Sequence, residues 1–310
     1  MSAEVAASWR SYLSGDERET PSAVTTVLER LRALFPDSSG RRVQQWLREG
    51  RVRGDGRVVR DARHAVTPGA ALILAPHGEP VFPAALRLVH EDDHLLVIDK
   101  PPGLLSIATE RERARTAYRL VWDYLAAQHP PRRPFVVHRL DRETSGLLVV
   151  AKSVAAKRRL QAQFVARTVE RRYVALVEGA VRDEQGTLQS ALIEDRGLRV
   201  RSARGGEGAR PGGALPRRAI THYRVLERRR DVTCVELLLG TGRRRQIRFQ
   251  LAELGHPIVG DAAHGSRLDA LRRLCLHATG LGFRHPATGA TVRFESPAPP
   301  EFRRVGTARR

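Results

Sequence analysis

Apolar residues near the start of the chain recur at the spacing of amphipathic helices. Residues 1–21 are polar and predict a loose lead-in. The expected helix ends are Ser22 and Pro36 for a first helix, and Ser39 and Gly50 for a second. The residues expected to face inward are Val24, Leu28, Leu31, Phe35, Val43, Trp46 and Leu47. A hairpin signal at Gly54-Asp55-Gly56 then completes a small α+β unit over residues 22–75.

The pattern changes after residues 76–87, whose prolines predict a linker. Short β-branched runs predict strands at 94–99, 135–137, 147–151, 171–178, 232–239, 276–278 and 291–294. Helices are expected at 115–128, after the cap Ser153, and before Gly255, the last burying Ile247, Leu251 and Leu254. Strands and helices do not alternate regularly. We therefore expect an α+β domain over residues 88–302 with a central, mostly antiparallel sheet, followed by a basic tail over 303–310.

Positive charge dominates the composition. The 310 residues carry a formal net charge of +20, and a hydrophobic fraction of 41% allows a sizeable core. This surplus favours a polyanionic partner, most simply nucleic acid, although solubility or genome composition would also produce it. Residues 199–218, rich in Arg, Gly and Pro, predict a mobile basic insertion between strands.

The chain has only two cysteines, Cys234 and Cys275, and both lie in apolar runs. Buried free thiols are expected, and without a CxxC pattern a structural zinc site is not. No signal peptide is visible, and no apolar run approaches the roughly 20 residues of a membrane span. We therefore expect a cytoplasmic, monomeric protein with no membrane partner.

One polar segment stands between two apolar runs: His138-Arg139-Leu140-Asp141-Arg142-Glu143-Thr144-Ser145-Gly146. Its flanks predict short buried strands, so the segment is expected to be a loop. Asp141 lies between two arginines. Such a carboxylate is either part of a structural ion pair or a nucleophile that is kept ionised, and both interpretations remain open from these residues alone.

The segment resembles the signature of the RluA-type RNA pseudouridine synthases. Further segments agree with that family in the expected order: Glu91-Asp92-Asp93 to Gly103, Tyr173 to Gly179, Thr241 to Arg248, Gly255 to Asp261, Leu276-His277-Ala278 and His285-Pro286. The resemblance implies the pseudouridine synthase fold and the isomerisation of uridine in RNA, with neither a metal nor a redox cofactor. An alternative is a non-catalytic RNA-binding or ribosome-assembly factor on the same fold; another is a hydrolase that uses Asp141 with His138 or Ser145.

The resemblance also implies roles for single residues. Asp141 is expected to attack the sugar or the base, or to abstract a sugar proton, while Tyr173 stacks on the uracil and assists proton transfer. A basic residue pairs with the aspartate: Arg248 is favoured over Arg243, and phosphate binding is the alternative for both. Arg139 is expected to fill the place of the flipped base. The expected substrate-binding residues are Arg139, Leu140, Arg243 and Gln246.

The chain departs from the family pattern at Arg245, Gln250 and His264, where histidine, histidine and tyrosine are common.

The small N-terminal unit resembles the alpha-L RNA-binding fold. Its expected phosphate-binding residues are Arg41, Arg42, Arg48, Arg51 and Arg53. That unit favours ribosomal RNA of the large subunit as the substrate, with transfer RNA as the alternative.

Overall fold

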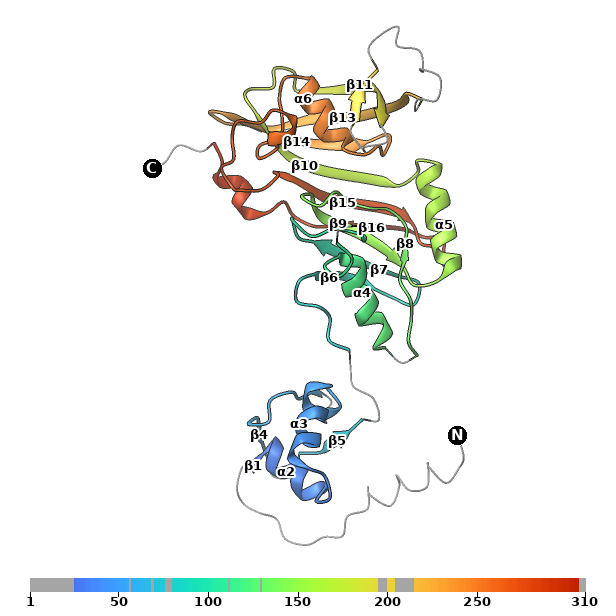
Figure 1. The fold of residues 1–310 in the computed structure, drawn as a ribbon, viewed down its shortest axis with the longest axis vertical. Helices are drawn as coiled ribbons and strands as arrows, with labels where there is room; N and C mark the ends of the chain where they lie inside the picture. The colour runs from blue at the N-terminus through green and yellow to red at the C-terminus, as the bar shows by residue number, and fades with distance from the viewer. Residues whose placement is uncertain are drawn as a thin grey trace. The chain divides into compact units, whose positions relative to one another are not determined.

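The computed structural model divides into two compact units between Val81 and Phe82 (Figure 1). It describes residues 25–55, 57–67, 70–75, 80–110, 112–128, 130–194, 200–203 and 215–306. Predictions that involve Ser22, Val24 or Gly56 therefore fall outside the described residues. The domain limits predicted above, and the linker over 76–87, stay predictions.

The N-terminal unit contains the two expected helices, α2 (Val27–Leu34) and α3 (Gly40–Arg48). Thr26, and not Ser22, caps α2, because Thr26 and Glu29 form a reciprocal capping box. Ser39 caps α3, as expected. The strands are β1 (Thr25–Thr26), β2 (Val52–Gly54), β3 (Arg57–Val58), β4 (Ala65–Val66) and β5 (Leu72–Leu74). Strands β2 and β3 form the predicted hairpin.

A single apolar cluster holds this unit together. It consists of Val27, Leu31, Val43, Trp46, Leu47, Val52 and Val66. These residues come from one face of each helix and from the strands, so the unit has a core of its own.

The larger unit is built on one sheet, which has eleven strands within the described residues. The strand order is β12-β11-β13-β14-β10-β15-β9-β7-β6, with β16 beside β15 and β8 beside β9. The bounds are β6 Arg87–Glu91, β7 Leu95–Lys100, β8 Phe135–Val136, β9 Ser145–Ala151, β10 Glu170–Glu178, β11 Gln185–Glu194, β12 Val200–Ser202, β13 Arg217–Arg228, β14 Val232–Leu239, β15 Leu276–Arg284 and β16 Thr291–Glu295. All pairs are antiparallel except β15 with β9. The expected α+β fold with a mostly antiparallel sheet is confirmed.

Alternation along β7 and β9 sends side chains to two separate cores. Leu96 and Ile98 pack with α4 (Ala117–Ala126) on one face of the sheet. Leu95 and Val97 pack with α5 (Val154–Val165) on the other face. Both helices were predicted, and Thr116 and Ser153 cap them. Strands β7 and β9 are therefore covered on both faces.

One prediction for the larger unit is wrong in part. Residues 200–202 and 217–218, expected in a mobile insertion, belong to β12 and β13 and pair with β11. Arg303 and Arg304, in the segment predicted as a basic tail, lie in a 3-10 helix over Pro300–Arg304, and Phe302 beside them is buried. Cys234 and Cys275 are buried free thiols, as predicted. No helix of the described residues is long and apolar enough to cross a membrane.

Candidate active site

The segment around Asp141 is a loop between β8 and β9, as its pattern predicts. Leu140 anchors the loop in the core: its side chain is 4% exposed, and its backbone bonds with the hydroxyl of Ser106. At the far end, Gly146 has φ +112°, and a Cβ there would lie 2.3 Å from the carbonyl oxygen of Ala278. The loop therefore joins strand β9 at a position that only glycine can occupy.

A buried lysine, Lys100, also holds this loop in place by a hydrogen bond. Lys100, at the end of β7, has no exposed surface, and its Nζ donates to the carbonyl oxygens of Pro101, Leu104 and Arg142 at 2.8, 2.8 and 3.1 Å. Burial lowers the pKa of Lys100 to about 7, although nearby Glu143 and Asp141 oppose the shift. Lys100 thus ties the loop after β7 to the loop that carries Asp141.

We expect Lys100→Met to lower stability by about 2 kcal/mol, because it leaves three partly buried carbonyl groups without this donor. The loop around Asp141 should loosen, so the catalytic rate should fall as well. Thermal unfolding and RNA isomerisation assays measure both effects, with Lys157→Met on α5 as the control. Wild-type stability together with a wild-type rate would contradict this role.

Asp141 faces the guanidinium of Arg248 across 3.7 Å, and its side chain is 23% exposed. Arg248 lies in α6 (Gln246–Glu253) and binds Asp261 much more closely, through Nε at 2.7 Å and Nη2 at 2.6 Å. His264 contacts the same Asp261 oxygen that Nη2 binds, at 3.0 Å. Arg248 is therefore held by one carboxylate while it faces another.

The electrostatics of this chain of residues keep its charges fixed. Burial raises the pKa of Asp261, but hydrogen bonds from Arg248 and His264 outweigh that effect and hold the pKa at about 2. Burial lowers the pKa of Arg248, but the hydrogen bonds that it donates to Asp261 and the charges of Asp261 and Asp141 more than reverse the shift. Arg248 is permanently cationic beside Asp141. The sequence analysis assigned no role to Asp261, although the residue ends the segment Gly255 to Asp261 that resembles the family.

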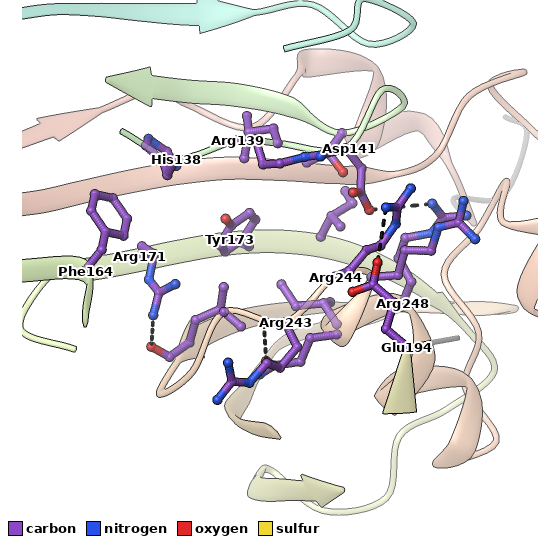
Figure 2. A pocket seen from close by; sticks show the side chains of 18 residues that line it. His138, Arg139, Asp141, Phe164, Arg171, Tyr173, Glu194, Arg243, Arg244 and Arg248 are labelled. Carbon is purple, nitrogen blue, oxygen red and sulfur yellow. Dashed lines mark hydrogen bonds and ion pairs between the residues drawn. The ribbon is translucent and has the colours of Figure 1, made fainter. Parts of the chain in front are cut away.

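Asp141 and Arg248 line one end of a cavity of about 400 Å³. Tyr173, on β10, lines its middle, and Figure 2 shows His138, Phe164 and Arg171 toward the other end. Tyr173 is 9% exposed, and burial raises its pKa to about 12, so it keeps its proton at neutral pH. The cavity therefore brings together a carboxylate, a fixed cation and an aromatic ring.

The residues that a hydrolase would use point elsewhere. His138 stacks on Phe164 with ring centroids 4.8 Å apart, and its Nε2 accepts a hydrogen bond from the backbone of Val149. Burial lowers the pKa of His138 to about 3, so it is neutral. Ser145 is buried and bonds with His277 and Arg273. Neither side chain is arranged to activate a nucleophile beside Asp141.

Two buried glutamines, Gln246 and Gln250, connect helix α6 to the sheet by hydrogen bonds. The side-chain oxygen of Gln246 accepts hydrogen bonds from the Thr241 hydroxyl and the Arg243 backbone, and its NH₂ group donates to β13. Because these bonds are all made within the protein, they favour a role in positioning α6 and not the predicted contact with substrate. Gln250 accepts from Thr221 at 2.6 Å. Leu254, predicted to be buried, is 40% exposed, because the glutamines occupy the inward face together with Ile247 and Leu251.

Arginines surround the mouth of the cavity. Arg139 is exposed and lines it from above in Figure 2. Arg243 lines it from the turn before α6, with Nε 3.4 Å from the Arg218 carbonyl oxygen. Arg244 pairs with Glu194 at 3.3 Å, and Arg245 has φ 52° at the start of α6. The structure therefore brings Arg248, and not Arg243, to Asp141.

In the N-terminal unit, Arg41, Arg42 and Arg48 lie on the exposed side of α3. Arg51 is partly occupied, since its Nε donates to the carbonyl oxygen of Ala75 at 2.9 Å and its guanidinium lies 5.8 Å from the Trp46 ring. Arg53 is half-buried on β2. The exposed arginines are thus presented by one helix.

Comparison with known proteins agrees with this geometry. Residues 94–253 match the family of RNA pseudouridylate synthases, and residues 29–72 match the S4 domain. The chain is 36% identical to ribosomal large subunit pseudouridine synthase D of Pseudomonas aeruginosa, over 87% of each chain. It is 35% identical to an uncharacterized RNA pseudouridine synthase of Bacillus subtilis, YlyB, over 86% of this chain and 88% of that protein.

A solved structure has the same fold. Human RNA pseudouridylate synthase domain containing 1 superposes with a TM-score of 0.54 at 27% identity, covering 72% of this chain and 86% of that one. The family match over residues 94–253 includes the loop that carries Asp141. The chain therefore belongs to the RluA-type family of RNA pseudouridine synthases, isomerases that act on uridine in RNA, and carries an N-terminal S4 domain.

Proposed function

We propose that this enzyme isomerises specific uridines of large-subunit ribosomal RNA, with Asp141 as its catalytic carboxylate. The observation that carries the catalytic part is the placement of Asp141 beside Arg248 in a cavity with Tyr173. The substrate is inferred from relatives named as ribosomal large subunit pseudouridine synthases, which align with most of the chain. Transfer RNA is the alternative substrate.

Asp141 supplies a carboxylate that faces a guanidinium and is accessible from the cavity. It attacks the sugar or the base, or removes a sugar proton, and each route needs the anion. Arg248 keeps the anion in place without quenching it, because Asp261 takes both of its close hydrogen bonds. A shorter ion pair between Arg248 and Asp141 would stabilise the carboxylate anion further and so make it a weaker nucleophile.

Tyr173 forms the platform on which the uracil turns. Its ring lines the middle of the cavity, and its protonated hydroxyl can donate to the base. Arg139, exposed at the mouth, fills the place that the flipped base leaves in the RNA stack, since a planar cation stacks well on neighbouring bases. Arg243 contacts the phosphates beside the target nucleotide.

The S4 domain adds contacts that do not depend on sequence. Arg41, Arg42 and Arg48 on α3 are exposed and suited to backbone phosphates. Arg51 contributes less, because its guanidinium also bonds within the domain. Arg53 completes the predicted set. The domain thereby holds the RNA, while the cavity selects the uridine.

Pseudouridine mapping in a strain that lacks the gene tests the substrate. We expect one or a few pseudouridines to disappear from large-subunit ribosomal RNA, and to return when the wild-type gene is restored but not with Asp141→Asn. Loss of sites from transfer RNA alone would contradict the ribosomal assignment. An unchanged map in both RNA classes would favour a non-catalytic binding factor.

A further inference from the structure

Arg171 places a buried positive charge in the end of the cavity away from Asp141. It precedes Tyr173 by two residues on β10, and both line the cavity (Figure 2). The residue is 9% exposed. Its Nη2 donates to the Leu239 carbonyl oxygen at a long 3.4 Å, and its guanidinium lies 5.8 Å from the Phe164 ring centroid. These contacts hold the group without neutralising it.

The charge of Arg171 is not compensated. Among the described residues, its Nε has no hydrogen-bond partner and no carboxylate pairs with the guanidinium. Burial lowers the pKa of Arg171. An unpaired buried cation destabilises a protein, so it is expected to persist where a ligand pairs with it.

The chain keeps space for this guanidinium. A Cβ on Gly242 would lie 2.4 Å from Nη1 of Arg171, and the φ of Gly242 lies outside the left-handed range. The backbone at Gly242 would thus accept another residue, and the steric conflict comes from Arg171. Gly242 therefore lets the guanidinium reach into the cavity.

We propose that Arg171 binds the detached uracil and stabilises its negative charge. When the bond between C1′ and N1 breaks, its electron pair leaves with the base, and the charge spreads over N1, O2 and O4. A buried cation that is already in place stabilises such an anion strongly. This inference rests on the proposed placement of the sugar at Asp141, with the ring over Tyr173 and its carbonyl oxygens toward Arg171.

The geometry of the reaction suits a donor at this end. The ring turns about the axis through N3 and C6, which exchanges N1 with C5 and also O2 with O4. Arg171 therefore meets an equivalent carbonyl oxygen before and after the turn. The electron pair then forms the bond from C5 to C1′ as the step between Asp141 and the sugar is reversed, which makes the base neutral. C5 afterwards loses its proton to solvent and N1 takes one up, so the base stays neutral.

The test measures tritium release from total RNA labelled at uridine C5 and isolated from a strain that lacks the gene. Such RNA contains the target whichever RNA class carries it. With enzyme in excess, we expect Arg171→Met to lower the maximal rate about 100-fold. The enzyme concentration that gives half the maximal rate should not change. The melting temperature should stay equal or rise, because an unpaired buried charge is removed.

Arg172→Met is the matched control. Arg172 is the next residue on β10, but it pairs with Glu295 at 2.7 Å on the surface. Its substitution should leave the maximal rate unchanged. Gly242→Ala should displace the guanidinium and lower the rate, and the double variant Arg171→Met with Gly242→Ala should be no slower than Arg171→Met alone.

Three results would overturn the inference. A wild-type maximal rate in Arg171→Met excludes the contact. A higher half-saturating concentration, with a shallower salt dependence and an unchanged maximal rate, assigns Arg171 to a phosphate instead. A lower melting temperature with unchanged kinetics makes it structural. Failure of the proposed site at Asp141 would appear separately, as tritium release by Asp141→Asn.

Discussion

Asp141→Asn is expected to lower tritium release from uridine-labelled RNA by at least about 10³-fold, because the amide has no charge with which to attack or to take a proton. The substitution keeps the shape of the side chain. Since Arg248 stays bound to Asp261, the melting temperature should remain near that of the wild type. Binding of RNA should also persist.

Glu143→Gln is the matched control, because Glu143 lies on the same loop and is exposed. Its loss of charge should change the rate less than about twofold, as surface substitutions do. Full activity in Asp141→Asn would remove Asp141 from the mechanism. Loss of activity in both variants would indicate a general effect of charge on the loop.

Arg248→Met is expected to destabilise the protein by about 3–5 kcal/mol and to abolish most of the activity. The carboxylate of Asp261, whose side chain is 1% exposed, would keep His264 as its one remaining side-chain partner among the described residues. Asp141 would lose its facing cation. Chemical denaturation measures the first effect, and tritium release measures the second.

A double variant separates the two effects. Adding Asp261→Asn to Arg248→Met removes the stranded charge, so much of the stability should return while the activity stays low. Recovery of both would mean that Arg248 acts only through stability. If neither the stability nor the activity returns, Arg248 stabilises the fold by more than balancing the charge of Asp261.

The ion pair of Arg248 with Asp261 also makes the stability of the fold depend on pH. The folded-state pKa of Asp261 is depressed to about 2, so its contribution to stability is complete above the ordinary carboxyl pKa of about 4 and is lost as the pH falls toward 2. Wild-type stability should fall across that range. Arg248→Met with Asp261→Asn should show a shallower fall, which denaturation at several pH values would detect.

Local patterns predicted most elements of the larger domain correctly. Strand β9 and helix α5 have the alternation and the cap that their structures require. Strand β13 was missed because its period-two pattern, with Ala219, Thr221 and Tyr223 inward, is crowded by charged residues and overlaps the basic segment. Burial in the sheet decided its structure, and propensity did not.

The inward face of α6 shows a similar limit. Helical spacing pointed to Leu254, whereas Gln246 and Gln250 are almost fully buried. Glutamine is ordinarily an exposed residue, and it is buried here because strand β13 supplies partners for its amide. Those partners are distant in sequence, so no local pattern indicates them.

The sequence by itself determined the family, the α+β class, the loop that carries Asp141 and the excess of positive charge, because short-range pattern and residue type suffice for these. Only the tertiary structure decided which arginine faces Asp141, that Asp261 holds it, and that Arg171 lines the cavity with no carboxylate of the described residues beside it. The physical reason is that ion pairing depends on distance in space and on burial, which chain order does not specify.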